Sequence, residues 1–182
     1  MKKETFGKIF AVLTLLLIIL PFVTTFSEQL TGFLQKTPIY LLIQKYIVPY
    51  EVKMVGFILS LLQIPVGYST STSSATLTVN GQPLIVTWNC LGWQSVLFLI
   101  VSFSTGLQGR FTTFSKIEVV AIGLLGTFWV NIARIIFIAI LGGYLPSVFA
   151  VVFHDYFATL VTAAWLIGFW HFAYKYGLEE VK

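Results

Sequence analysis

Three side chains that could carry nucleophilic chemistry lie in separate apolar stretches of this 182-residue sequence. Cys90, the single cysteine, stands in VTWNCLGWQSV, Arg134 in FWVNIARIIFIAI and His154 in VFAVVFHDYFATL. A thiol attacks carbonyl groups as the thiolate, and a neighbouring histidine or arginine lowers its pKa. These residue types therefore indicate acyl transfer, in which an amide is cleaved and a thioester forms on the cysteine.

Each of these residues, and each of three neighbours, suits a role in that reaction. His154 takes the thiol proton and later returns it to the leaving amine. Arg134 supplies positive charge where an oxyanion develops, or grips a substrate carbonyl. Asn89 could add an oxyanion donor, and Asn131 could orient the arginine or the histidine. Asp155 adjoins His154 but points about 100° away on a helix, so it serves at most as an orienter.

The spacing of the three residues predicts that they meet. A turn centres near Tyr144, with Arg134 ten residues before it and His154 ten residues after it. Going up one helix and down the next by equal counts brings both side chains to one level. With some residues spent in the turn, that level is roughly 10 Å below the outer edge, at about 1.5 Å per residue. The cytoplasmic ends of the helices give a second estimate. Cys90 lies 14 residues from Ser104, or about 21 Å, and Arg134 lies 16 residues from Glu118, or about 24 Å.

Taken alone, each residue also has a structural explanation. A lone cysteine can be an inert small apolar residue, and Arg134 could anchor a helix end. His154 could cap a neighbouring carbonyl, while His171 belongs to an aromatic belt with Trp170. The level that cysteine, arginine and histidine share favours the functional interpretation over these separate explanations.

The composition predicts an integral membrane protein. Hydrophobic residues make up 57% of the chain and charged residues 10%, with a mean hydropathy of +0.89. Soluble domains are close to half apolar and a quarter charged, so these charges are too few to cover a water-facing surface. The net charge of +4 fits basic loops against an anionic leaflet and disfavours nucleic acid as a partner. One cysteine excludes an intramolecular disulfide, and neither nucleotide-binding nor metal-binding motifs occur.

We therefore expect an all-α integral membrane helical bundle that forms a single membrane domain over residues 1–182, with catalytic helices over 89–174. Basic residues at the N-terminus, in the 110–116 loop and in the tail place all three on the cytoplasmic side, which requires an even number of crossings. About six hydrophobic segments are expected, at 9–26, 40–49, 54–66, 88–103, 117–141 and 147–174.

The number of crossings stays open between six and four. Six crossings result if residues 38–48 and 50–67 form a pair of short spans that turn near Pro49. Four result if residues 28–67 lie on or dip into the outer interface. In both arrangements Cys90 lies at the outer end of its helix.

A small extracytoplasmic β-hairpin is expected over residues 75–88, after an exposed loop at 67–75. Asn80 and Gly81 form the pair that a two-residue type I′ turn prefers. Pro83 cannot donate to a ladder, so its strand should lie at an edge. This turn makes one face apolar and pairs Val79 with Gln82, Leu77 with Leu84, and Ala75 with Val86.

The order of these motifs resembles the exosortase/archaeosortase family over roughly residues 83–165. A cysteine at the mouth of a helix is followed after 44 residues by the arginine of NIAR, an Asn-x-x-Arg pattern, and after 20 more by a histidine. The resemblance implies Cys90 as nucleophile, Arg134 as transition-state stabiliser and His154 as acid and base. It implies no metal and no organic cofactor.

The resemblance also implies a substrate and a location. Members of that family are membrane cysteine transpeptidases of prokaryotes that recognise a C-terminal sorting signal: a short motif, a transmembrane helix and a basic tail. They cut exported proteins there and transfer the new carboxyl end to a lipid or another acceptor. We accordingly expect a multi-pass protein of the prokaryotic cell membrane, with its active site near the extracytoplasmic face. Where the family has Ala before the cysteine and Ser-Gly after it, this chain has Asn89 and Leu91-Gly92, so the sorting motif and the acceptor stay open.

Two other functions remain as alternatives. The chain could be a non-enzymatic membrane assembly factor whose Arg134 and His154 pair with a partner helix. It could also be a transporter with polar residues along a pathway, although the sequence shows neither an inverted repeat nor paired broken helices.

Overall fold

The computed structural model describes residues 29, 31, 32, 34–70, 75–146, 148, 149 and 153–180. The chain divides into two units, Met1–Tyr40 and Leu41–Lys182. Most of the first unit, including the hydrophobic segment expected at 9–26, lies outside the described residues. The architecture below is that of the second unit.

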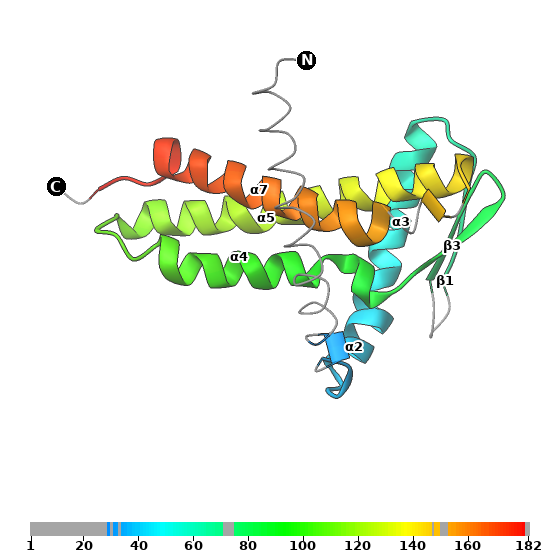
Figure 1. Ribbon diagram of the computed structural model, residues 1–182, viewed down its shortest axis with the longest axis horizontal. Coiled ribbons are helices and arrows are strands. Elements are labelled where there is room, and N and C mark those ends of the chain that lie inside the picture. The colour runs from blue at the N-terminus through cyan, green and yellow to red at the C-terminus, as the bar shows by residue number, and fades with distance from the viewer. Residues whose placement is uncertain are drawn as a thin grey trace, which may run out of the picture. The chain divides into compact units, whose positions relative to one another are not determined.

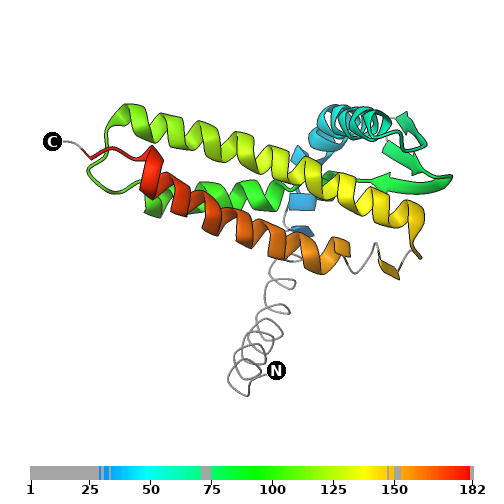
Figure 2. The same cartoon turned by 90° about the horizontal axis from the view of Figure 1, so that it is seen from above.

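Along this unit, helical segments are followed by three consecutive strands and then by three further helices. Helices α4, α5 and α7 run side by side, and the sheet lies against α3 and the C-terminal part of α5 (Figures 1 and 2). The elements are α2 (Ile39–Leu42), the π-helical turn η1 (Ile43–Ile47), α3 (Val48–Leu61), β1 (Val66–Thr70), β2 (Ala75–Val79), β3 (Gln82–Val86), the 3₁₀ turn η2 (Trp88–Leu91), α4 (Trp93–Gly106), α5 (Thr113–Tyr144), the π-helical turn η3 (Phe153–Phe157), α7 (Ala158–Phe172) and the π-helical turn η4 (Ala173–Gly177).

The sheet contains the predicted hairpin. Its strands are antiparallel in the order β1-β2-β3, so β3, which carries Pro83, lies at an edge. Asn80 and Gly81 have φ angles of 50° and 79°, the positive values that a type I′ turn requires. The observed register matches the predicted one, pairing Val79 with Gln82, Leu77 with Leu84, and Ala75 with Val86.

The first strand corrects the loop expected at 67–75. Residues Val66–Thr70 form β1 and pair with β2 from Val66 opposite Val79 to Thr70 opposite Ala75. Four of the five β1 residues are exposed, whereas Ala75, Leu77 and Val79 of β2 are buried. Because β1 buries almost nothing of its own, its sequence lacks the apolar alternation by which strands are recognised.

A second correction concerns Pro49, where a turn between two short membrane crossings was expected. The helix instead continues from η1 into α3, and Pro49 lies in the first turn of α3. A proline inside a helix removes one backbone hydrogen bond, and the π-helical turn η1 directly before α3 is an irregularity of the kind at which helices accommodate such a break. The pair of crossings at 38–48 and 50–67 is therefore absent.

The expected all-α membrane bundle of about six hydrophobic segments is wrong. Among the described residues, one helix, α5 with 32 residues, is long and apolar enough to cross a membrane. Helix α4 has 14 residues, fewer than the roughly 20 that a span needs. The three-stranded sheet is also foreign to an all-α bundle with only a small hairpin.

The same finding corrects the expected multi-pass location in the prokaryotic cell membrane, with its extracytoplasmic active site. One helix of membrane-spanning length in the part of the chain that is described is too few for a multi-pass protein. The composition was misleading because it counts apolar residues without showing which helices and strands they form.

Away from the sheet, α4, α5 and α7 enclose a group of side chains that we call the aromatic core. Two indole N–H groups in it donate to hydroxyl oxygens: Trp165 to Thr127 at 2.8 Å and Trp170 to Ser102 at 3.0 Å. The ring of Trp165 lies directly against Gly126, which leaves no room for a larger residue. The buried members of the aromatic core are Leu99, Val119, Phe169 and Ala173, with Phe103, Leu107, Ile122, Trp165, Leu166, Trp170 and Leu178 packed around them.

Candidate active site

Cys90 lies in a tight turn between a strand and a helix. After β3 the chain enters η2, where the Trp88 amide donates to Gln44 Oε1 at 2.6 Å and the Cys90 amide donates to the Thr87 carbonyl at 2.9 Å. Gly92 then takes a left-handed conformation, with φ of 65°, and α4 starts at the next residue. The helix expected from about residue 88 is thus broken at Gly92, and the cysteine belongs to the turn before it.

Gly92 is required here for its size as well as for its conformation. A Cβ atom on this residue would lie 2.5 Å from Asn131 Oδ1 and 2.8 Å from Asn131 Cγ. These distances are shorter than van der Waals contact, and positive φ disfavours every residue that carries a Cβ. The turn that presents Cys90 therefore packs directly on α5 through a glycine.

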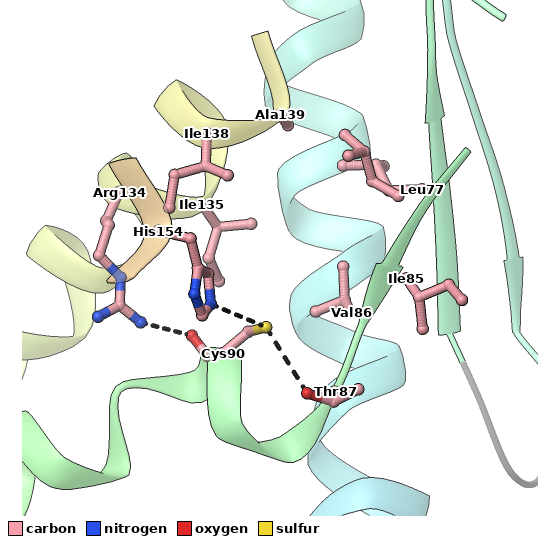
Figure 3. Close-up of a pocket in the computed structure, with 11 residues that line it drawn as sticks. Leu77, Ile85, Val86, Thr87, Cys90, Arg134, Ile135, Ile138, Ala139 and His154 are labelled. Carbon is pink, nitrogen blue, oxygen red and sulfur yellow. Dashed lines mark hydrogen bonds between the residues drawn. The ribbon is translucent and has the colours of Figure 1, made fainter. Parts of the chain in front are cut away.

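The imidazole of His154 faces the thiol. Cys90 Sγ lies 3.6 Å from His154 Nε2 and 3.7 Å from Thr87 Oγ1 (Figure 3). His154 belongs to η3, and π-helical turns of this kind often occur at functional sites. Burial raises the pKa of the Cys90 thiol, but the hydrogen bonds with His154 and Thr87 and the charge of the imidazole outweigh it, so the pKa lies below its ordinary value.

Arg134 contacts the same cysteine from the opposite side. Its Nη2 atom donates to the Cys90 carbonyl oxygen at 2.7 Å (Figure 3), and its positive charge acts on both Cys90 and Glu51. A charge-assisted hydrogen bond of this length is among the stronger ones that proteins make. The guanidinium therefore fixes the peptide unit of the cysteine and places positive charge near its sulfur.

Glu51 is a member of this site that sequence reasoning missed. It lies in α3 with 5% of its surface exposed, and its Oε1 accepts from Asn131 Nδ2 at 2.9 Å. Burial raises its pKa to about 7, against the opposing effects of Asn131 and Arg134. The only sequence signal was a carboxylate within the apolar stretch VPYEVKMVGF, and nothing there links it to a residue 80 positions later.

Glu51 and its neighbours also leave polar atoms unsatisfied. In the described part of the chain, the buried side-chain nitrogen and oxygen atoms without a hydrogen-bond partner are Glu51 Oε2, Asn131 Oδ1 and Arg134 Nε. Such atoms are rare in folded proteins, because each costs about 1–3 kcal/mol. That all three belong to one cluster marks it as a place where packing is not optimised for stability.

The supporting residues differ in where they lie. Asn131 was expected to orient Arg134 or His154. Its side chain instead donates a hydrogen bond to Glu51. The side-chain oxygen of Asn89 accepts from Trp93 Nε1 at 3.1 Å and so braces the turn. Asp155 lies within η3, but its side chain lies outside the described part of the structure.

A cavity of about 400 Å³ opens beside these groups. This volume is in the range of small-molecule sites. Four of its lining residues are polar, namely Thr87, Cys90, Arg134 and His154, and the other seven are Leu77, Leu84, Ile85, Val86, Ile135, Ile138 and Ala139. Within the described residues, no group of three His, Cys, Asp or Glu side chains is placed to hold a metal ion.

Comparison of the chain with known proteins identified no relative. No protein-family model matches the chain, and neither the curated proteins nor the solved structures contain a match. The function must therefore be argued from the site itself.

Proposed function

We propose that the chain is a cysteine peptidase or transpeptidase that forms a thioester on Cys90. The observation that carries this proposal is the 3.6 Å approach of the only thiol in the chain to His154 Nε2, at the wall of a ligand-sized cavity. An activated nucleophile is recognised by a base within hydrogen-bonding reach, and sulfur contacts are longer than oxygen contacts. The lowered pKa of the thiol is consistent with this role.

The reaction follows from these positions. His154 Nε2 takes the thiol proton, and Cys90 Sγ attacks the carbonyl carbon of an amide. The carbon–nitrogen bond then breaks, and the amine leaves with the proton that the imidazole returns. The thioester that remains is attacked by water in a peptidase, or by an amine or hydroxyl group in a transpeptidase, and the thiol is regenerated.

Arg134 would support both steps through its contact with the nucleophile. Its hydrogen bond to the Cys90 carbonyl holds the turn in place, so the sulfur is positioned before substrate binds. Its charge also favours the thiolate and the developing oxyanion over their neutral forms.

The finer proposal concerns the substrate. The order Cys90, Asn-x-x-Arg, His154 is similar to that of the exosortase/archaeosortase family, which supports a transpeptidase that cuts a C-terminal sorting signal from exported proteins. The new carboxyl end would pass to a lipid or another acceptor, and hydrolysis is the variant in which water takes that place.

The first test measures the ionisation of Cys90. The purified protein is alkylated with iodoacetamide across a pH series, and intact mass reports the modification of its single thiol. We expect a midpoint below about 8.5, the ordinary value for cysteine, and a higher midpoint in His154→Gln. His171→Gln is the matched control, since it removes the other histidine of the chain, and should behave as wild type. A midpoint that His154→Gln leaves unchanged would contradict the proposal.

The second test measures the reaction. An activated ester such as p-nitrophenyl acetate should release a burst of p-nitrophenolate and add one acetyl group to Cys90. The His154→Gln variant should acylate about 10²–10⁴ times more slowly, and Cys90→Ala should not acylate at all. The finer proposal is tested in a strain that carries Cys90→Ser. If every exported protein is processed there as in the wild type, the transpeptidase is ruled out.

A further inference from the structure

We infer that the cavity beside Cys90 binds an aliphatic group attached to the carbonyl that the cysteine attacks. The substrate is then an acyl compound with an apolar chain, supplied either by an aliphatic side chain of a peptide or by the alkyl chain of a fatty acyl ester. This inference rests on the proposed function, because it assigns the acyl side of the same reaction.

The two kinds of wall in the cavity support this assignment. Thr87, Cys90, Arg134 and His154 gather on one side, and the walls beyond them come from β2, β3 and the C-terminal part of α5 (Figure 3). Those walls carry only aliphatic side chains, among them Ile138. A polar or charged group in that part would lose its hydration without gaining a partner, which is costly.

The apolar walls of the cavity are already packed in the absence of a ligand. Leu77 of β2 and Ala139 of α5 have 0% and 3% of their surface exposed, and Val86 of β3 has 5%. Leu77 belongs to the central strand, whose register is fixed by the type I′ turn. Because these walls are packed before any ligand arrives, little ordering is needed on binding.

Geometry sets the direction in which such a substrate lies. The reacting carbonyl must reach Cys90 Sγ, where His154 and Arg134 also lie. The chain bonded to that carbonyl then extends into the aliphatic part, between β3 and α5. The leaving group departs on the side away from this part of the cavity, so the cavity selects the acyl group rather than the amine.

The test measures acylation of Cys90 by p-nitrophenyl esters from acetate to octanoate. The acylation rate constant should rise about fourfold with each methylene added, equivalent to about 0.8 kcal/mol, until the cavity is filled. Ala139→Leu, which fills the cavity, should shorten the best chain. Ile138→Ala, which enlarges the cavity, should lengthen it. Ala121→Leu adds the same side chain to an exposed position of α5 about 27 Å away and should leave the profile unchanged.

A second arm distinguishes the two sources of the aliphatic group. Peptidyl thioesters ending in leucine or glycine are compared with the octanoyl ester. A preference of at least tenfold for leucine over glycine assigns a peptide, and a preference confined to the long alkyl esters assigns a fatty acyl group.

The outcomes separate this inference from the proposed function. If acetate acylates Cys90 but longer chains react no faster, the cavity does not bind the acyl group and the inference is overturned. The same holds if neither Ala139→Leu nor Ile138→Ala moves the profile; where Ala139→Leu lowers stability too far to be assayed, Ile138→Ala decides. If no ester acylates Cys90, the proposed function fails, and the inference fails with it.

Discussion

The aromatic core and the candidate active site use the same long helix in opposite ways. Around the N-terminal half of α5, Trp165 and Trp170 are partly buried against the aromatic core and donate their indole N–H groups to hydroxyl oxygens. Around its C-terminal half, Arg134 and Asn131 keep buried atoms without partners, and Arg134 borders a cavity. The difference shows that one end of the helix serves stability, while the other gives up part of it to hold reactive groups.

Glycines in both regions allow close approach, but what they approach differs. Gly126 admits the ring of Trp165, so its absent side chain serves apolar packing. Gly92 admits the amide of Asn131, so its absent side chain serves a polar cluster beside the thiol. Substitutions at these positions can therefore break each region separately.

Gly92→Ala should have the largest effect on stability. The alanine must adopt φ of 65° and also displace Asn131, which together should lower the free energy of unfolding by about 3 kcal/mol. Acylation of Cys90 should slow at least about tenfold, since the turn that presents the thiol shifts. Chemical denaturation and burst kinetics measure the two effects.

Gly81→Ala is the matched control for this substitution. Gly81 also has positive φ, at 79°, but nothing lies within 4 Å of a Cβ placed there. Gly81→Ala should lower the free energy of unfolding by only about 1–2 kcal/mol and leave the acylation rate of Cys90 unchanged. Equal losses in the two variants would show that the contact with Asn131 does not matter.

Glu51→Gln should change the dependence of stability on pH. The folded pKa of about 7 is above the ordinary 4.5, so the carboxyl group binds its proton more tightly in the folded state. Its contribution is complete below about pH 4.5 and is lost as the pH rises through 7. Between pH 5 and pH 8 the free energy of unfolding should fall by about 2–3 kcal/mol more in the wild type than in the glutamine variant. Denaturation curves at the two pH values measure this difference, and parallel losses would show that Glu51 does not titrate with a raised pKa.

Gly126→Ala should have the smallest effect of the three and should act on stability alone. Its methyl group would meet the ring of Trp165, which is held in place by the bond to Thr127, so we expect a loss of about 1–2 kcal/mol. Gly168→Ala, on the exposed side of α7 where nothing lies within 4 Å, should instead add about 0.5–1 kcal/mol. Thermal unfolding compares the pair. A slower acylation rate in folded Gly126→Ala would show that the two regions are coupled.

Local signals in the sequence were sufficient for some parts of this molecule. Asn80-Gly81 determines a turn by itself, and the register of β2 and β3 follows from it. Equal counts on either side of Tyr144 place Arg134 and His154 at one level, and the structure brings both to Cys90. The catalytic roles of these three residues stay predictions.

Other parts depended on information that a single sequence does not contain. Glu51 reaches Asn131 only through the packing of α3 on α5, a contact between distant positions. Strand β1 is defined by its partner and not by its own pattern. The apolar composition showed that many side chains avoid water, but not that part of them would form a three-stranded sheet.

The direction in which the His154 imidazole points depends on the number of residues in the π-helical turn η3. Such a turn closes i→i+5 hydrogen bonds and so holds about one residue more than an α-helical turn. Removing one residue between His154 and the start of α7 would rotate the imidazole by about 100° relative to α7. A chain shortened in this way would keep the same histidine but turn it away from the sulfur.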